Sequence, residues 1–238
     1  MELAKEGSLK RFIVVEPKKV KGKQDTEIEN LLFSKFCETF KEFENVKLIN
    51  NSVFSSNQKL SEILIERPDL TQAIQKATGN DYFCLFEITN ARENNPGLNR
   101  TSQKAYEEVK ITQAGNVVQT QYKPLDYSVV KSSRSFSFLL NLKIIDAKNN
   151  QIVSNQSENI TASDQIEYNE LPKSFNGKVS NLFPYNPETT PIANRFNPNN
   201  WRQNFQKSRN LKSAEELNDE AKNNAVSTFK NNIKTQLR

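Results

Sequence analysis

The sequence predicts an α/β (α+β) fold, built as a mixed β-sheet of about five strands flanked by helices. Three observations lead to this prediction. Residues 135–145 alternate between apolar and polar side chains, and residues 81–88 are apolar on both faces, as in a central strand. Two further segments, 26–43 and 213–237, repeat apolar residues at helical spacing, so each has one apolar face that can cover a sheet.

The strand over 135–145 is the element on which the rest of the predicted sheet depends. Burying each of its large apolar side chains is worth about 1.5–3 kcal/mol. Asp146–Asn150 then offers turn residues that bond back to nearby backbone, and Gln151–Ile160 is predicted to return as the second strand of a hairpin. The apolar side chains recur at every second position and share one face; they are Phe136, Phe138, Leu140, Leu142 and Ile144.

The amino-terminal part of the chain is predicted to add two short strands and two short helices. Arg11–Glu16 is a β-branched run that stops before a proline, and Val46–Ile49 is a second short apolar run. One helix is expected around Leu60–Leu64. Another is expected over Leu70–Ala77, where Gly79 closes it as a left-handed C-cap.

Two longer helices each begin with a capping box, in which a hydroxyl side chain and a glutamate satisfy free backbone N–H groups. Thr26 and Glu29 form the first box, and Ser213 and Glu216 form the second. Both helices should lie on the sheet, because each carries an apolar stripe. The stripes consist of Ile28, Leu31, Leu32, Phe36, Phe40 and Phe43, and of Leu217, Ala221, Ala225, Phe229, Ile233 and Leu237.

The chain is predicted to form a single domain over 1–238. Its core is expected to be 11–160 together with the terminal helix over 213–237. Residues 90–127 alternate only weakly and read as a polar hairpin insertion. Residues 161–209 contain five prolines among many asparagines, so we expect a long irregular arm there.

The composition allows a core but points to long surface segments. The chain is 35% hydrophobic and 26% charged, and its formal net charge is +5, a mild excess of basic residues spread along the sequence. No run approaches the ~18 apolar residues that a membrane helix needs, and no secretory leader begins at Met1. We therefore expect a soluble chain, with any leader or lipid anchor lying outside this sequence.

The residue types that most catalytic sites use are missing. There is no histidine, which removes the commonest general base and the commonest transition-metal ligand. Only six glycines are present, without a phosphate-binding glycine motif. We therefore predict that the protein is not an enzyme and holds no cofactor or metal.

Three carboxylates and two thiols are the remaining candidates for reactive groups. Asp81, Glu87 and Asp146 lie in strands or at their ends, where burial could raise a pKa. Asp81 follows a helix end and Asp146 opens a turn, so a structural role accounts for both. Cys37 and Cys84 fall in apolar patterns, which leaves two alternatives open: two buried free thiols, or a disulfide if helix and strand pack at the right separation.

Nucleic-acid binding is a less favoured alternative. A binder concentrates lysine and arginine on one face and interleaves them with stacking aromatic residues. Here the aromatic residues fall mostly at core positions, and acidic residues are mixed among the basic ones. We therefore expect no nucleic-acid partner.

Three segments resemble a family of bacterial envelope domains: the curli secretion channel subunit, the amino-terminal domain of TolB, and the lipoproteins that activate penicillin-binding proteins. Ala77–Ile88 (ATGNDYFCLFEI) looks like the family's "TGADYVVxGxI", with Asn80 for alanine and Glu87 for glycine. Leu140–Val153 looks like its "LxxRxxDxxTGEIV" hairpin. The helix over 28–43 followed by 46–49 is similar to its "LxxxLxxxxxFxVVER".

The resemblance implies a location in the bacterial cell envelope, periplasmic or associated with the outer membrane, where members usually carry a lipidated cysteine near the mature start. No cysteine precedes Cys37. In the channel subunit two insertions form membrane-spanning hairpins. The matching regions here, 90–127 and 161–209, lack the apolar alternation that crossing a bilayer requires. We therefore expect a soluble accessory member of the family.

These observations together predict a non-catalytic protein-interaction module of an envelope assembly, with protein partners and a homo-oligomer left open. Four aromatic residues of the two insertions are candidate anchors, because Tyr and Trp are typical binding hot spots: Tyr106, Tyr122, Tyr127 and Trp201. The alternative reading is that they hold the insertions to the domain. The alternative function is a subunit of a curli-type secretion channel.

Overall fold

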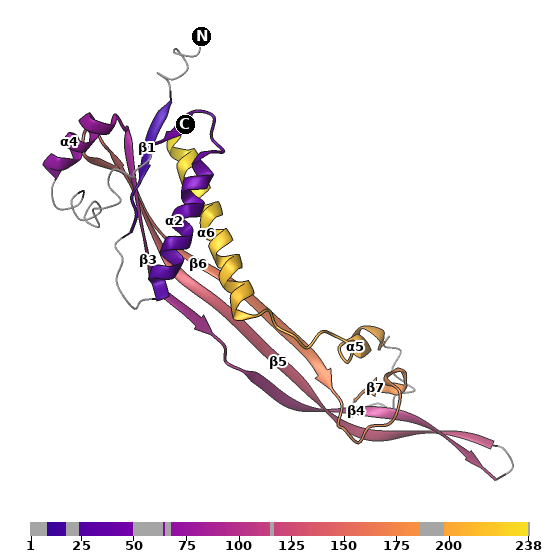
Figure 1. The fold of residues 1–238 in the computed structure, drawn as a ribbon. Helices are drawn as coiled ribbons and strands as arrows, with labels where there is room; N and C mark the ends of the chain where they lie inside the picture. Colours follow the sequence, from indigo (N-terminus) through magenta and orange to yellow (C-terminus); the bar gives the residue numbers. More distant parts are fainter. Residues whose placement is uncertain are drawn as a thin grey trace. The chain divides into compact units, whose positions relative to one another are not determined.

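A computed structural model describes residues 9–17, 24–49, 64, 68–114, 117–185 and 198–237. Over these residues the fold is mixed α/β, with a seven-stranded sheet and four α-helices (Figure 1). The strands are β1 (Lys10–Val14), β2 (Val46–Leu48), β3 (Tyr82–Asn94), β4 (Leu98–Gln113), β5 (Val117–Asp146), β6 (Gln151–Glu170) and β7 (Leu182–Pro184). The helices are α2 (Gln24–Phe40), α4 (Pro68–Thr78), α5 (Asn199–Gln203) and α6 (Ala214–Leu237), with a 3-10 turn, η2, at Val179–Asn181.

The chain divides into two compact units. Unit 1 comprises residues 1–93, 135–162 and 214–238, and unit 2 comprises 94–134 and 163–213. Strands β5 and β6 each contribute one part to either unit. The single domain expected over 1–238 stays a prediction, because this division by itself does not show that either unit folds alone.

The sheet of unit 1 contains the five strands that the sequence predicted for its core, β1, β2, β3, β5 and β6. Strand β1 lies between β2 and β3 and runs parallel to both, with Phe12 opposite Leu48 on one side and Tyr82 on the other. Beyond β3 come β5 and then β6. The turn between β5 and β6 forms as expected, since Asp146 Oδ1 accepts hydrogen bonds from the backbone N–H groups of Lys148 and Asn149.

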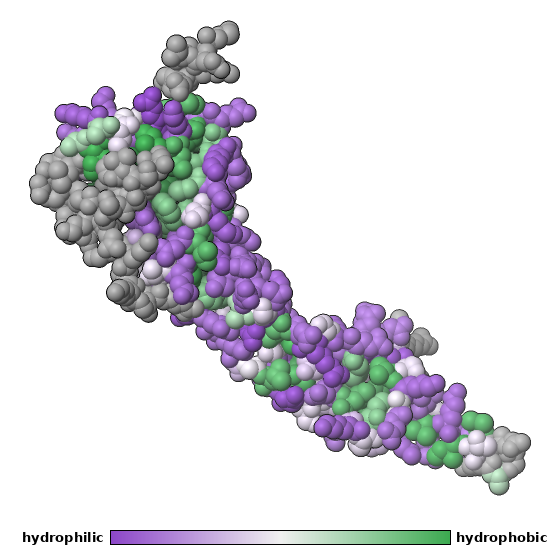
Figure 2. Space-filling model, in the orientation of Figure 1, coloured by the Kyte–Doolittle hydropathy of each residue, from purple (hydrophilic) through white to green (hydrophobic). Residues whose placement is uncertain are grey.

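Helices α2 and α6 lie side by side on one face of this sheet (Figure 1). Their buried apolar residues belong to the two predicted stripes, and they pack on the alternating apolar face of β5. Leu31 is the exception: it is 51% exposed, because it sits to one side of the Ile28, Leu32 and Phe36 row that faces the sheet. Hydrophilic side chains predominate on the exposed surface over α2 and α6, with some hydrophobic residues among them (Figure 2).

The opposite face of β1 and β3 carries a smaller core. Ile13, Phe83 and Ile145 are buried there, with Ile74 of α4 packed against them. Helix α4 ends as predicted at Gly79, whose φ is +69° and whose N–H donates to the Gln75 carbonyl at 2.7 Å. Of the helix expected around residues 60–64, Leu64 alone lies within the described residues; it is helical and buried in this core.

Unit 2 is built on a long antiparallel hairpin of β4 and β5. All sixteen residues of β4 pair with β5, from Leu98 opposite Ser132 to Gln113 opposite Val117. The polar hairpin predicted over 90–127 therefore exists, but its second strand continues without a break into the predicted strand over 135–145, and the two together form β5. Residues 128–134 are mostly polar, so the pattern of apolar residues did not predict that they are extended. Backbone pairing in the sheet keeps this stretch of β5 extended.

Residues 161–209 are more regular than the irregular arm that the sequence predicted. Strand β6 continues to Glu170, and its even-numbered residues Ala162 and Tyr168 are buried. Strand β7 then pairs with β4, and α5 follows. Short period-two patterns among prolines and asparagines are weak signals, and pairing with distant strands decided the structure instead. Residues 186–197 lie outside the described part of the chain.

Candidate functional site

The four candidate aromatic residues all lie in unit 2, but on opposite faces of the β4–β5 hairpin. In this pairing Tyr106 is opposite Pro124 and Tyr122 is opposite Glu108, so both tyrosines share one face. Tyr127 is five residues after Tyr122 on β5. Successive side chains of a strand alternate between the two faces, so Tyr127 lies on the face opposite to Tyr122. The structure thus divides the candidates into two groups with different surroundings.

Tyr127 and Trp201 belong to the core of unit 2. Tyr127 is 9% exposed, and its phenol oxygen accepts a hydrogen bond from Trp201 Nε1 at 3.3 Å. The two rings meet edge to face at 5.7 Å, and Phe205 packs on both, at 5.4 and 5.0 Å. These contacts attach α5 and the following turn to the hairpin. For this pair, therefore, the geometry favours the reading that they hold the segment in place.

Tyr106 and Tyr122 contact the short strand β7 and the residue after it. Pairing places Phe183 opposite Tyr106. The Tyr122 ring meets the Phe183 ring edge to face at 5.8 Å, and Tyr106 lies against Tyr185 at 5.1 Å. Tyr185 is 38% exposed, while the other three are half-buried. We call these four residues, Tyr106, Tyr122, Phe183 and Tyr185, the aromatic surface.

Two cationic side chains lie over this aromatic surface. Lys104 Nζ is 5.8 Å from the centre of the Tyr185 ring, and the Arg202 guanidinium is 4.7 Å from the centre of the Phe183 ring. Both distances are within the range of cation–π attraction. Arg202 is also held in place, because its Nε donates to the Leu182 carbonyl at 2.8 Å.

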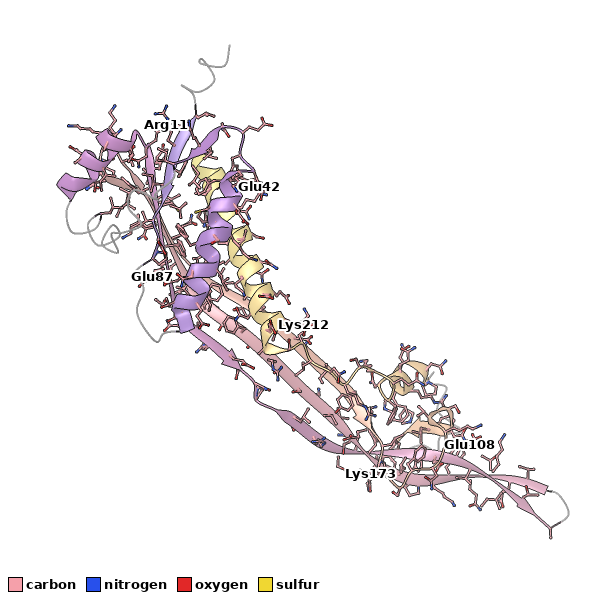
Figure 3. All side chains as sticks on the ribbon, in the orientation of Figure 1. Arg11, Glu42, Glu87, Glu108, Lys173 and Lys212 are labelled. Atoms are coloured by element: carbon pink, nitrogen blue, oxygen red, sulfur yellow. The ribbon has the colours of Figure 1, made fainter. Side chains whose placement is uncertain are left out.

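Glu108, on β4, is an acidic residue in contact with the aromatic surface (Figure 3). The Tyr122 hydroxyl donates to Glu108 Oε2 at 3.3 Å. Burial raises the pKa of Tyr122, and the Glu108 charge and this hydrogen bond raise it further. Burial lowers the pKa of Arg202, and the Glu108 charge opposes that effect.

The basic excess of the chain lies in unit 2. By sequence, unit 2 holds 13 of the 33 lysines and arginines but only 7 of the 28 acidic residues, so unit 1 is close to neutral. Along the sequence the basic residues are spread over the whole chain. In the fold this basic excess is concentrated in unit 2, because two stretches that are separate in the sequence, 94–134 and 163–213, come together there.

The carboxylates weighed for catalysis have structural partners and do not converge. Asp81 Oδ2 accepts the backbone N–H of Arg11 at 2.8 Å, and Asp146 holds its own turn. Glu87 is exposed on β3, where it accepts a hydrogen bond from Asn141 Nδ2 at 3.4 Å (Figure 3). Across the described ranges, no cluster of three or more His, Cys, Asp or Glu side chains could hold a metal ion.

Cys37 and Cys84 are free thiols in this structure. Burial raises the pKa of the Cys37 thiol to about 11, and the nearby Glu38 carboxylate adds to the shift. Burial likewise raises the pKa of Cys84, which is fully buried. Neither thiol has the low pKa that a nucleophilic cysteine requires.

Sequence reasoning missed most of the partners of Tyr106 and Tyr122. Tyr185 and Arg202 lie in the stretch that was expected to be irregular, and Glu108 is one charged residue among many on a polar strand. The strand that carries Phe183 is three residues long and pairs with residues more than seventy positions earlier. No local pattern predicts such a long-range pairing.

No helix in the described part of the chain is both long enough and apolar enough to cross a membrane. No protein-family model matches the sequence, and no curated protein matches it. Among solved structures, lipoprotein GNA1162 from Neisseria meningitidis is similar with a TM-score of 0.34 and 14% identity, over 66% of this chain and 83% of that one. A protein described as a homolog of neuraminyllactose-binding hemagglutinin from Helicobacter pylori is similar with a TM-score of 0.33 and 12% identity, over 93% and 90%. The chain therefore shares a distant structural similarity with these two proteins, one of them a bacterial lipoprotein.

Proposed function

We propose that this chain is a non-catalytic protein-interaction module of a bacterial cell-envelope assembly, periplasmic and close to the outer membrane, and that the aromatic surface of unit 2 binds its partner. The envelope location rests on the sequence motifs over 77–88 and 140–153 that resemble the domain family named above. The binding role rests on the geometry of the aromatic surface.

The observation that carries the proposal is a set of aromatic rings held rigidly at the surface of a hairpin. Tyr106 and Tyr122 are fixed on paired strands, and β7 brings Phe183 and Tyr185 against them. Rings that are already ordered lose little conformational entropy when a partner covers them. Tyrosines in such positions supply large contact areas, and each also has a hydroxyl for a hydrogen bond.

The charges around the aromatic surface favour an acidic partner segment. Lys104 and Arg202 lie over the rings, and the whole of unit 2 carries an excess of basic residues. A positive surface speeds the association of an acidic partner and makes binding sensitive to salt. We therefore expect the partner to present an acidic stretch with at least one apolar or aromatic side chain.

The test is co-purification from envelope extracts of cells that express the chain, with wild type compared with Tyr185→Ala. Leu98→Ala is the matched control, because Leu98 is also an exposed apolar residue of unit 2, at 53%, but lies outside the aromatic surface. The partner should copurify with wild type and with Leu98→Ala, and should be reduced several-fold with Tyr185→Ala. Equal recovery with all three proteins would contradict the proposal.

A nucleic-acid partner is the competing outcome, because unit 2 is basic. Several of its basic side chains are already paired within the unit: Lys131 Nζ lies 3.0 Å from Glu167, and Arg100 Nε lies 3.3 Å from Glu170. We therefore expect no retention on single-stranded or duplex DNA at moderate salt. Retention that Tyr185→Ala abolishes would assign the aromatic surface to nucleic acid instead.

A further inference from the structure

Strand β6 forms a long edge of the sheet in unit 1. Among the strands of the described residues, β5 is its one neighbour, so alternate backbone N–H and C=O groups of β6 face away from the sheet. Strand β2, at the opposite edge, is only three residues long and carries an exposed lysine, Lys47. Short length and a lysine are common ways of preventing unwanted strand pairing, so the two edges differ in this respect.

The edge over Gln151–Ile160 has none of these protections. Its sequence, QIVSNQSENI, contains one charged residue, Glu158, and no proline, glycine or lysine. Ile152 is 56% exposed and Val153 is 41% exposed, so each face of the strand presents an aliphatic side chain to solvent next to this edge. An edge with a single charge and exposed aliphatic side chains is suited to accept another strand.

Helix α6 marks where this free edge ends. Asn224 Nδ2 donates to the Thr161 carbonyl at 3.2 Å, and Ile160 and Ala162 are buried against the core that α6 covers. The Thr161 carbonyl accepts this bond from α6, so it does not point toward β5. Backbone groups of a strand alternate in direction from one residue to the next, so the other odd-numbered carbonyls of this stretch also face away from β5. The free part of the edge is therefore about ten residues long, and its middle lies near Gln156.

We propose that this edge pairs antiparallel with the same edge of a second copy of the chain, around a twofold axis at Gln156. In this register Ile152 lies beside Ile160 of the second copy. The exposed side chain of Ile152 then extends the row of apolar residues on the face of the sheet where Ile160 lies. Ser154 lies beside Glu158 of the second copy and can donate to its carboxylate. Glu158 is the one charge on this edge, and the register sets no like charge opposite it.

A second copy fits this edge better than an unrelated strand because the edge complements itself. Under twofold symmetry the same residues serve on both sides, and the contact closes after two copies without growing into a fibre. Each Gln156 faces its own counterpart, where two amide side chains can bond to each other. The contact uses unit 1 alone and is independent of the aromatic surface proposed above for partner binding.

Sedimentation velocity over a concentration series tests the pairing with two matched variants. Ile152→Lys places a charge on the proposed interface, and Leu31→Lys replaces a similarly exposed aliphatic residue on α2, outside it. Wild type and Leu31→Lys should form a dimer, and Ile152→Lys should need at least tenfold more protein to do so. A wild type that stays monomeric at the highest concentration reached would overturn the proposal, as would an Ile152→Lys variant that dimerises like wild type.

Cross-linking tests the register. In the proposed register the two copies of Gln156 face each other on the twofold axis and share no backbone hydrogen bond. The Cα atoms of such a pair are about 4.5 Å apart, a separation that a disulfide can span. Gln156→Cys should therefore form a covalent dimer under a mild thiol oxidant, seen on a non-reducing gel. Glu158→Cys, which would face Ser154, should remain largely uncross-linked. So should wild type, whose thiols are partly buried (Cys37) or fully buried (Cys84) and lie outside this edge. Equal cross-linking of both variants, or none in a proven dimer, would show the register to be wrong.

Discussion

Phe36 of α2 and Phe229 of α6 stack with their ring centres 4.0 Å apart and their planes within 5° of parallel. Both rings are fully buried, and Phe36 also meets Phe86 of β3 edge to face at 4.9 Å. The pair therefore joins the two helices to each other and to the sheet. Residues almost two hundred positions apart in sequence form the centre of the unit 1 core.

Replacing Phe229 with alanine should lower the free energy of unfolding by about 3–5 kcal/mol, because it removes a buried ring and leaves a cavity between the helices. Urea denaturation followed by circular dichroism measures the change. Thr235→Ala is the control on the same helix, at an exposed position, and should change stability by less than about 0.5 kcal/mol. Similar values for the two variants would contradict the central role of the stack.

Alanine substitutions should separate the two groups of candidate aromatic residues. Tyr127→Ala and Trp201→Ala remove members of the unit 2 core, so the melting temperature should fall. Tyr185→Ala removes an exposed ring, so the melting temperature should stay nearly unchanged while partner binding falls. Scanning calorimetry together with the co-purification assay distinguishes these results. A binding defect in Trp201→Ala with unchanged melting would restore Trp201 as an anchor.

Tyr122 should make stability fall at alkaline pH. Its pKa is raised in the folded protein, chiefly by burial, so folding favours the neutral phenol. The stability it contributes is complete below the unfolded pKa of about 10 and is lost as the pH rises through the folded pKa. Comparing denaturation of wild type and Tyr122→Phe across this range isolates its contribution.

The Phe variant should lose less stability than wild type above about pH 10, since it has no phenol to ionise. Glu108→Gln offers a second check, because it removes the carboxylate charge that adds to the shift. That variant should fall between the other two. Identical alkaline profiles for wild type and Tyr122→Phe would contradict the assignment.

The two thiols should react slowly in the folded protein. Burial raises the pKa of Cys37 to about 11, so little thiolate is present near neutral pH, and Cys84 is inaccessible. Iodoacetamide labelling followed by intact mass should show slow addition at one site in native protein, and rapid addition at two sites in denaturant. Cys37→Ser identifies the site. Rapid native labelling of Cys84 would mean that α2 opens readily.

Part of the candidate site could be inferred from sequence, and part could not. The sequence predicted three tyrosines and a tryptophan in the polar insertions as binding candidates, and the structure gathers all four residues in unit 2; their binding role stays a prediction. Which face each residue takes depends on the register of β4 with β5, set by backbone pairing along polar strands. Tyr185 and Arg202 join the site only through the pairing of β7 with β4, which has no local sequence signal.

Local sequence patterns were enough to predict the five strands of unit 1 and its helices α2, α4 and α6. The alternating apolar residues of β5, the stripes of α2 and α6 and the Gly79 cap each follow from local periodicity and backbone conformation, which neighbouring residues specify. Three features follow instead from contacts between distant residues: β5 and β6 each contribute residues to both units, Tyr127 is buried while Tyr106 is not, and the basic excess gathers in unit 2. The physical reason is that strand pairing joins residues far apart in the chain, and its energy comes from backbone groups that every residue carries alike.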